Sequence, residues 1–512
     1  MLKQNYTINK LLGTGLVLHF STEFDCCTQC GQQLKIEKVK TKTVHTITYG
    51  IFSARETIKH CPTCKLKYRS NQLPQIIKPG NSYSYDCIVE VGMLRYIHKR
   101  QIVEIEAGMA EKYQIGISQT QIRRMCYLFL NYLGRLHYSK SNQLCLSMKN
   151  KGGYILFVDS TCEGNSPHLL TCIDGVSGFV LYSQKIRSEN ADTLIESFKK
   201  VKQLYGAPLC AVHDMGPGII KALDMVFLSL RHIICHFHLL RDLGKDLLQA
   251  QYRKIQKALS NEEIYAQIKY QVQGLEKLIG DKQSAEQLFL KIEDGAQKDP
   301  AQLLLGILYG LLLNLKSREK KADSYGFPFD CTKLEYYKLV KETHRKLVEI
   351  DKLKEFTTKL KTALRFYKIK DVLNSIVSNK HLSQDVQQLE KRIVYFDKLR
   401  DIMRIAIPGT KAGLNDEGKA LTEKEYKGME QELKGFVKQL ERHKKKEKKG
   451  SDDYQKLDGV IKQLNKYWDK IFPSPIKVIY NSKSKLIYPS RTNNRSEQFY
   501  RKIKHLLRRC DR

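Results

Sequence analysis

The sequence lacks any apolar run long enough to cross a membrane. Its longest run, from Leu303 to Leu313, falls short of the roughly 20 residues that a spanning helix needs, so it predicts a buried helix instead. The apolar stretch from Leu11 to Phe20 has a lysine before it but no small-residue cleavage site after it, which argues against a secretory signal. We therefore expect an intracellular protein with no membrane partner.

Negative charge is also in short supply. The 512 residues include 54 Asp and Glu against 88 Lys and Arg, which leaves a formal net charge of +34. The excess is spread along most of the chain rather than confined to one tail. Such a field attracts polyanions, with nucleic acid as the first candidate and an anionic membrane surface as the second. At this length the chain has room for roughly three domains.

Cysteine is not scarce, but its arrangement does not indicate disulfides. Four of the 14 cysteines form two Cys-x-x-Cys pairs, and the others are scattered singly through apolar segments, as in a reducing compartment. Cys27 pairs with Cys30 and Cys61 with Cys64, on either side of a β-rich stretch. Four thiolates at the ends of a hairpin form the tetrahedral ligand set of a structural zinc ion. We expect a zinc ribbon over residues 1–78, although Cys26 leaves the first ligand ambiguous.

A helical pattern follows over residues 79–145. The expected helices are Tyr85 to Ile97, Arg100 to Tyr113 and Ser118 to Leu133, with a turn at Gly116 and an N-cap at Ser118. This pattern fits a helix-turn-helix with a polar, basic second helix, although an ordinary three-helix packing unit has the same pattern. The side chains that would contact DNA are Gln119, Gln121, Arg123 and Arg124.

Strands and helices alternate over residues 150–240. The expected strands are Tyr154 to Asp159, Leu169 to Ile173, Phe179 to Ser183, Leu209 to His213 and Arg231 to Ile234, and the expected helices are Asn190 to Tyr205 and Gly218 to Phe227. This βββαβαβ order is the RNase H-like arrangement, in which the first and fourth strands lie side by side. Asp159 and Asp214, which end those strands, would then be neighbours.

The periodicity is helical almost throughout residues 241–474, which predicts a large all-α insertion. Three clear amphipathic segments are Leu334 to Leu353, Val386 to Ile405 and Thr422 to Arg442. The lysine-rich run from Arg442 to Gly450 is interpreted as a solvated break. Residues 475–512 should close the α/β core with two short strands, Val478 to Tyr480 and Leu486 to Tyr488, and a basic helix from Asn493 to Arg509.

Three acidic residues suggest a divalent metal pocket. Asp159 and Asp214 follow short apolar runs, and Glu497 opens the last basic helix. A carboxylate that ends a buried strand is costly unless a cation meets it. Two alternatives remain open: Asp214 could begin a turn, and Glu497 could complete a capping box with Asn494. Asp174, by contrast, is predicted to be a hairpin turn residue rather than a fourth ligand.

These motifs together resemble those of DDE transposases of the Mutator-like, hAT-like and related bacterial insertion-sequence groups. The stretch from Asp214 to Leu223, then Cys235 and His238, is similar to their second-Asp region and Cys-x-x-His signature. The box Thr492-Asn-Asn-Arg-Ser-Glu497, followed by Arg501 and Lys504, is similar to their third-acid helix. The resemblance covers about residues 150–510, and a helical insertion before the Glu is a feature of that family.

The resemblance implies an RNase H-like α/β catalytic core with a large all-α insertion, preceded by a zinc ribbon and a helix-turn-helix. Asp159, Asp214 and Glu497 would hold two Mg²⁺ or Mn²⁺ ions, which assist attack on a phosphodiester and stabilise the leaving oxygen. The activity implied is cleavage at element ends and strand transfer. The partners would be double-stranded DNA, both terminal inverted repeats and target, and further copies of the chain, as a homodimer or higher oligomer, in the cytoplasm or on the nucleoid.

Further residues receive supporting roles. Cys235 and His238 are expected to have a structural role beside Asp214 rather than to form half a zinc site. Trp468, the only tryptophan, is either a core residue or a residue that stacks on a flipped base. Phosphate contacts are expected from the basic side chains of the last helix, which are Arg495, Arg501, Lys504, Arg508 and Arg509.

Two other functions stay open at this point. The first is a transposase-derived DNA-binding regulator or truncated copy without catalytic activity, because few residues follow Glu497. The second is a structure-specific nuclease on the same fold.

Overall fold

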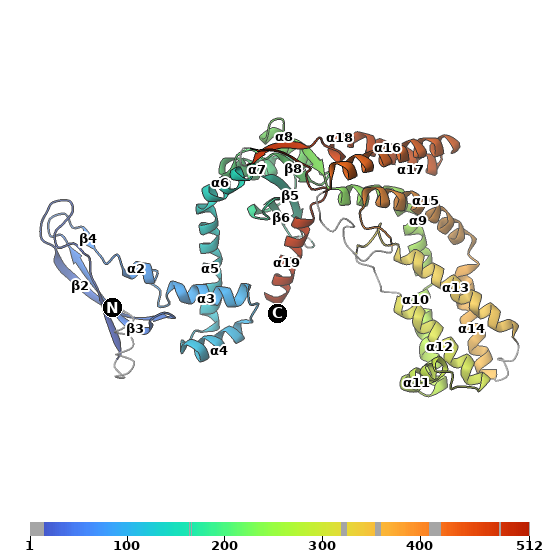
Figure 1. The fold of residues 1–512 in the computed structure, drawn as a ribbon. Helices are drawn as coiled ribbons and strands as arrows, with labels where there is room; N and C mark the ends of the chain where they lie inside the picture. Colours follow the sequence, from blue (N-terminus) through green and yellow to red (C-terminus); the bar gives the residue numbers. More distant parts are fainter. Residues whose placement is uncertain are drawn as a thin grey trace. The chain divides into compact units, whose positions relative to one another are not determined.

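The computed structural model describes residues 15–510 apart from residues 163, 165, 319–324, 354–359, 409–420 and 481–482 (Figure 1). Part of the apolar stretch from Leu11 to Phe20 therefore lies outside the described residues. The chain divides into two compact units: Met1–Ser147 with Glu497–Arg512, and Met148–Ser496. Each unit is described by itself.

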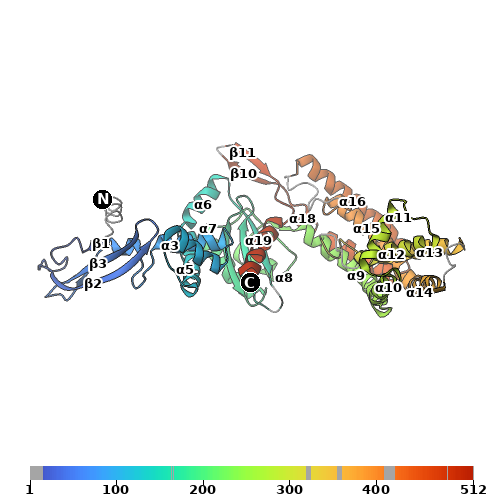
Figure 2. The same cartoon turned by 90° about the horizontal axis from the view of Figure 1, so that it is seen from below.

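The first unit begins with a small sheet built on a long hairpin, drawn in blue in Figure 2. Strands β2 (Lys35–Thr46) and β3 (Gly50–His60) pair antiparallel, β1 (Leu16–Phe20) pairs parallel with β3, and β4 (Lys67–Tyr68) also pairs with β3. Alternate residues of β1 are buried, as the period of a half-buried strand requires. Only one end of the hairpin packs on this core, through Val44 and Phe52, together with the short helix α2 (Leu73–Ile76).

Three helices follow, α3 (Tyr85–Tyr96), α4 (Ile102–Tyr113) and α5 (Gln119–Ser139), and then α6 (Ser141–Asn150). The first three share an apolar core, and Ser118 caps α5 by accepting a hydrogen bond from the Gln121 amide, as predicted. The predicted break around Gly116 is confirmed, because residues 114–118 connect α4 and α5. The left-handed residue of this connection is Gln114, with φ of 56°, rather than Gly116.

A five-stranded sheet forms the start of the second unit. Its strands are β5 (Ile155–Thr161), β6 (His168–Asp174), β7 (Val180–Ile186), β8 (Cys210–His213) and β9 (His232–Ile234), in the order β7-β6-β5-β8-β9. The strands β5, β6 and β7 are antiparallel, and β8 pairs parallel with both β5 and β9. The predicted adjacency of the first and fourth strands is confirmed. β5 is central, and its first five residues are all buried.

The crossover helices α7 (Ala191–Tyr205) and α8 (Pro217–Val226) join the parallel strands. Asn190 caps α7 by accepting a hydrogen bond from the Thr193 amide. Leu194, Phe198 and Val201 of α7 recur at helical spacing and are fully buried. The apolar face of α7 is therefore the face that packs on the core.

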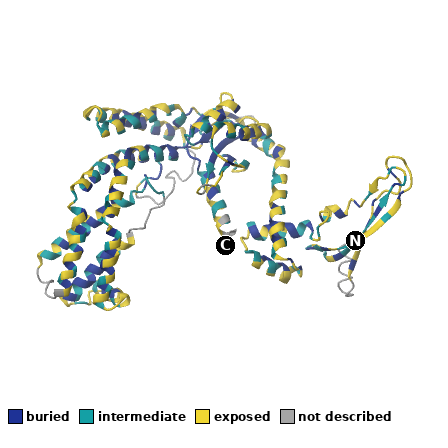
Figure 3. Ribbon diagram, turned by 180° about the vertical axis from the view of Figure 1, so that it is seen from behind, coloured by how far each residue is buried: buried dark blue, intermediate teal, exposed yellow. Residues whose placement is uncertain are grey.

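A large helical region follows in the same unit. Its helices are α9 (His236–Asn261), α10 (Ile264–Ile279), α11 (Lys282–Glu293), α12 (Pro300–Arg318), α13 (Thr332–Lys352), α14 (Leu360–Val377), α15 (Lys380–Met403), α16 (Glu423–Lys446), α17 (Asp452–Lys466) and α18 (Trp468–Ile471). They share one continuous apolar core, visible as dark segments along the helices in Figure 3. Within the described part of the chain, no helix is both long and apolar enough to cross a membrane.

The lysine-rich run was partly misinterpreted. We expected a solvated break from Arg442, but α16 continues to Lys446, so the first part of the run forms the last turn of a helix. Cations in that position interact favourably with the partial negative charge of the helix C-terminus. The remainder of the run does form the connection to α17.

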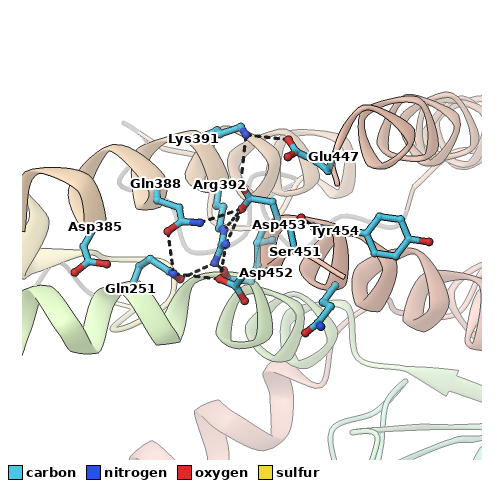
Figure 4. A network of polar contacts seen from close by, with 12 residues as sticks. Gln251, Asp385, Gln388, Lys391, Arg392, Glu447, Ser451, Asp452, Asp453 and Tyr454 are labelled. Atoms are coloured by element: carbon cyan, nitrogen blue, oxygen red, sulfur yellow. Dashed lines mark hydrogen bonds and ion pairs between the residues drawn. The ribbon is translucent and has the colours of Figure 1, made fainter. Parts of the chain in front are cut away.

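A buried arginine joins three helices of this region (Figure 4). Arg392 of α15 is 2% exposed and donates hydrogen bonds to Asp452 Oδ2 at 2.7 Å, Asp453 Oδ1 at 2.6 Å and Gln251 Oε1 at 2.5 Å. The aspartates open α17 and Gln251 lies on α9. A guanidinium can satisfy several acceptors at once, so one side chain of α15 connects the middle of α9 to the start of α17.

The described chain ends with a hairpin and a helix. β10 (Ile476–Tyr480) pairs antiparallel with β11 (Lys483–Ile487), and α19 spans Asn494–Cys510. The connecting residues Arg491, Thr492 and Asn493 are buried although they are polar. Arg491 donates to the Met403 carbonyl at 2.6 Å, and the partners of Asn493 belong to the candidate site.

Candidate functional site

The four paired cysteines meet at the open end of the β2–β3 hairpin. Their sulfur atoms all lie within 4.8 Å of one another. Each pair forms the same kind of turn: the Gly31 amide donates to the Cys27 carbonyl, and the Lys65 amide donates to the Cys61 carbonyl. Both donors have positive φ, 73° for Gly31 and 59° for Lys65. Two matching turns that converge four thiols form a site that can hold a metal such as zinc.

The structure also selects the first ligand. Cys27 is buried within this group, whereas Cys26 is exposed and outside it. The Tyr68 hydroxyl donates to Cys27 Sγ at 3.2 Å and lowers the pKa of that thiol to about 6. The crowded neighbours have the opposite effect on Cys64, where the Cys30 thiol raises the pKa to about 12. A bound divalent cation supplies the positive charge that four adjacent thiolates need.

Asp159 and Asp214 belong to neighbouring parallel strands, but the predicted strand end at Asp159 was wrong: β5 continues to Thr161, whereas Asp214 directly follows β8. Phe157 of β5 is paired with Val212 of β8. Asp159 lies two residues after Phe157, and Asp214 lies two residues after Val212. Asp159 is 8% exposed, and Asp214 is partly buried. The Gly216 amide donates to Asp214 Oδ1 at 3.1 Å, so Asp214 does begin a turn, as the alternative held. That bond does not exclude metal binding by the same carboxylate.

Asp174 is a turn residue, as predicted. Its carboxylate accepts hydrogen bonds from the Val176 amide at 3.0 Å, the Ser177 amide at 3.0 Å and the Ser177 hydroxyl at 2.6 Å. These bonds close the connection between β6 and β7. The buried charge is therefore satisfied locally.

The segment before Glu497 is anchored to the sheet. Asn493 is 1% exposed, its side-chain amide donates to the Val158 carbonyl at 3.0 Å, and its backbone amide donates to Cys235 Sγ at 3.4 Å. Ser496 is fully buried, and its hydroxyl donates to Asn493 Oδ1 at 2.6 Å. Glu497 follows Ser496 directly and groups with the first unit. Its role as a third metal ligand stays a prediction.

The capping-box alternative for Glu497 is wrong. α19 begins at Asn494, so Asn494 is the first helical residue and Asn493 is the residue that precedes the helix. Asn494 and Glu497 are therefore not related as N-cap and third helical residue.

Cys235 and His238 have structural positions around Asp214. The Cys235 amide donates to the His213 carbonyl at 2.8 Å, while its sulfur accepts from Asn493. Burial lowers the pKa of His238 to about 4 and Arg241 adds to the effect, whereas the negative charge of Asp214 opposes it. The imidazole is therefore neutral at pH 7. Among the described residues, neither side chain belongs to a group of three or more clustered metal ligands.

Two polar clusters were not predicted from the sequence. In the first, His213 Nε2 lies 2.9 Å from His232 Nδ1, and His232 Nε2 lies 2.9 Å from Asp224 Oδ1. Burial lowers the pKa of His213 to about 4. The signal available in the sequence was a histidine that ends β8 and another that begins its parallel neighbour β9.

The second cluster surrounds Glu189. Its carboxylate contacts the hydroxyl of Ser160, the residue after Asp159, and lies 3.5 Å from His168 Nδ1. The backbone carbonyl oxygen of Glu189 packs against Gly218. A Cβ at that position would lie 2.1 Å from this oxygen, so only glycine fits there. Glu189 therefore contacts the segments that follow both acids.

The side chains predicted to contact DNA differ in solvent exposure and in their hydrogen bonds within the protein. Gln119 Nε2 donates to Glu106 Oε2 at 3.0 Å, Gln121 is half-buried, and Arg123 and Arg124 are exposed. Arg495 is exposed and donates to the Val176 carbonyl at 3.0 Å. Further along α19, Arg501 and Arg508 are exposed, Lys504 is half-buried, and the side chain of Arg509 lies outside the described residues.

Trp468 is half-buried at the margin of the helical core. Its ring centroid lies 5.3 Å from that of Phe472, and Lys434 Nζ lies 5.7 Å from the ring centre. The packing favours the core alternative, and stacking on a flipped base stays a prediction.

No protein-family model matches the chain, and no curated protein sequence matches it significantly.

Proposed function

We propose that this protein is a DNA transposase that cleaves element ends and joins them to target DNA with the aid of divalent metal ions. The observation that carries the proposal is that Asp159 and Asp214 occupy equivalent positions on two neighbouring parallel strands, each two residues beyond the paired residues Phe157 and Val212. Carboxylate oxygens so placed are suited to Mg²⁺ or Mn²⁺, which prefer hard oxygen ligands. Glu497 is the proposed third ligand.

The surroundings of the two acids support this assignment. Asn493 binds the backbone of the strand that carries Asp159, and Cys235, which receives the Asn493 amide, binds the last residue before Asp214. The chain that leads to Glu497 is therefore tied to both acid-bearing strands. Such anchoring gives candidate ligands a defined backbone, which metal catalysis requires.

The proposed reaction is phosphoryl transfer without a covalent enzyme intermediate. Two bound ions would activate water or a 3′-hydroxyl and stabilise the oxygen that leaves phosphorus. In the first step the oxygen of water would bond to phosphorus as the P–O3′ bond at the element end breaks, which releases a 3′-hydroxyl and leaves a 5′-phosphate. In the second step that 3′-hydroxyl would attack a target phosphodiester, form a new bond to phosphorus and displace the 3′-hydroxyl of the target strand. The carboxylates of this chain would hold the ions that assist both steps.

Other parts of the molecule would recruit the DNA. The net charge of +34 favours a polyanion, and Arg123 and Arg124 are exposed on the basic start of α5. The four-thiol site, with Zn²⁺ as the proposed ion, would stabilise the β2–β3 hairpin, which precedes these helices in the sequence. Joining two ends requires two catalytic centres, so we propose that the chain acts as a homodimer or higher oligomer on DNA.

A cleavage and strand-transfer assay tests the proposal. Full-length protein would be given a labelled duplex made from the flanks of its own gene, with Mg²⁺ or Mn²⁺. We expect end-specific nicking and joining that require metal and disappear in Asp159→Asn and Asp214→Asn. Asp192→Asn, an exposed aspartate at the start of α7, serves as the matched control and should retain activity.

Specific binding to these flanks without cleavage under either metal would contradict the proposal. That result would favour the alternative of a DNA-binding regulator without catalytic activity.

A further inference from the structure

A cavity of about 520 Å³ lies beside the residue that follows Asp214. It is formed by α8 on one side and by the end of α17 and the start of α18 on the other, with Met215 between them. The volume falls within the range of roughly 300–1,000 Å³ that is usual for small-ligand sites. All of its lining belongs to the second unit, so its shape is defined by contacts within one compact body.

The lining of this pocket is cationic. Lys221, Lys466 and Lys470 contribute ammonium groups, against a single acid, Asp224. Asp224 is already engaged, because its carboxylate lies 2.9 Å from His232 Nε2. Burial lowers the pKa of His232, and the charge of Lys470 adds to that effect, which places this ammonium near the imidazole. The net positive charge favours an anionic ligand.

The pocket also has an aromatic and apolar side. Tyr467 is half-buried, and Lys466 Nζ lies 5.0 Å from the centre of its ring. Met215 and Met225 contribute flexible apolar side chains. A ligand that fills such a pocket has a flat, apolar portion and at least one anionic group. Nucleotides have both.

A neighbouring cavity of about 400 Å³ shares Met215, Lys466 and Tyr467, and in its lining Asp242 and Asp246 balance Lys245 and Lys466. Burial raises the pKa of Asp242, whereas the nearby positive charges of Arg241 and Lys245 lower it. Of these two cavities, only the pocket between α8 and α18 has an excess of lysines over acids.

We propose that the pocket between α8 and α18 binds one nucleotide unit, with its phosphate on Lys221, Lys466 and Lys470 and its base against Tyr467. The unit can come from a single-stranded part of a DNA strand or from a free nucleoside phosphate, since both present the same chemistry. A base-paired duplex is too wide for a pocket of this volume. The inference requires binding but no cleavage, so it stands apart from the proposed catalytic function.

Binding without divalent metal tests the proposal. The probes are thymidine 5′-monophosphate and a short fluorescent thymidine oligonucleotide, each titrated into the full-length protein. In the double variant Lys466→Glu with Lys470→Glu, we expect affinity for at least one probe to fall roughly tenfold or more, because two charge-assisted contacts become repulsive. Lys462→Glu is the matched control, an exposed lysine of the same helix paired with Asp458.

A photocrosslink locates the bound base. An oligonucleotide that contains 5-iododeoxyuridine should crosslink to the peptide that includes Tyr467, and this product should disappear in Tyr467→Leu. Circular dichroism of each variant checks that the fold is retained. Loss of mononucleotide affinity in the double variant identifies a free nucleotide as a ligand, and loss for the oligonucleotide alone identifies a DNA strand. If neither affinity changes relative to Lys462→Glu, or the crosslinks lie elsewhere, the proposal is overturned.

Discussion

The Asn493 side-chain amide donates a hydrogen bond of 3.0 Å to the backbone carbonyl of Val158, 335 residues away in the sequence. Val158 immediately precedes Asp159, and Asn493 lies four positions before Glu497. The bond holds the end of the chain against the central strand of the sheet. It also explains why Asn493 can be buried, because both its amide and its carbonyl oxygen have partners within the second unit.

We expect Asn493→Ala to destabilise the second unit by about 1–3 kcal/mol, because the buried Val158 carbonyl and Ser496 hydroxyl would each lose a partner. Denaturant unfolding of the full-length protein measures the change. Asn494→Ala, at the half-buried next position, is the control and should have a smaller effect. Equal stability of the two variants would contradict an anchoring role for Asn493.

Removal of metal should disorder the hairpin of the first unit. The part of the hairpin that leads to the cysteines carries the exposed apolar residues Ile36 and Val39, so it has little core of its own, and an isolated two-stranded hairpin is marginal in water. We expect a chelator, or Cys61→Ser, to increase amide hydrogen exchange in residues 24–69 and to release about one zinc ion per chain. Cys26→Ser should retain the metal. Full metal content in Cys61→Ser would contradict the four-thiol site.

Arg392→Met should destabilise the helical region. The substitution leaves Asp452, Asp453 and Gln251 without their shared donor, and breaking a buried ion pair costs about 3–5 kcal/mol. We expect the lower end of that range, because Asp452 is half-exposed. Thermal or denaturant unfolding measures the change. Arg345→Met removes two exposed ion pairs from α13 and should cost no more than about 1 kcal/mol.

The same network predicts a loss of stability in acid. Burial raises the pKa values of Asp452 and Asp453, but the hydrogen bonds and charge of Arg392 outweigh burial and hold both pKa values below the usual range. Folding therefore favours the ionised carboxylates. Their contribution is complete above the unfolded-state pKa of about 4 and is lost as the pH falls through the lower folded-state values.

The pH dependence can be assigned to the network by comparison. Unfolding free energies measured between pH 7 and pH 3 should fall less steeply in Arg392→Met than in the unsubstituted protein, after normalisation at pH 7. Parallel curves for the two proteins would show that Asp452 and Asp453 do not carry this dependence.

Arg123 and Arg124 should contribute to DNA affinity through charge. We expect the double variant Arg123→Ala with Arg124→Ala to bind duplex DNA more weakly and to reduce the slope of log affinity against log salt by about 1–2, because roughly one counterion is released per phosphate contact. Fluorescence anisotropy over a salt series measures both quantities. Lys112→Ala, an exposed lysine near the end of α4, is the control. An unchanged salt slope would exclude α5 from the DNA interface.

Much of the fold could be predicted because its signals are local. The helical spacing of Leu194, Phe198 and Val201 and the caps at Ser118 and Asn190 depend on residues only a few positions apart. β1 was not predicted, because its exposed Val17 hides the alternation in the sequence. The adjacency of β5 and β8 was expected because the order of elements is that of an RNase H-like arrangement. The two cysteine pairs could be recognised in the same way, because their spacing is itself the metal-binding pattern.

The sequence by itself thus determined most of the elements, the four-thiol ligand type and the two acids that follow apolar runs. Only the tertiary structure decided that Cys27 rather than Cys26 joins the thiols, that Tyr467 rather than Trp468 lines a pocket, and that Glu189 contacts the segments after both acids. The physical reason is distance along the chain. Packing and hydrogen bonds between residues tens to hundreds of positions apart leave no local period, so they become defined only when the chain is folded.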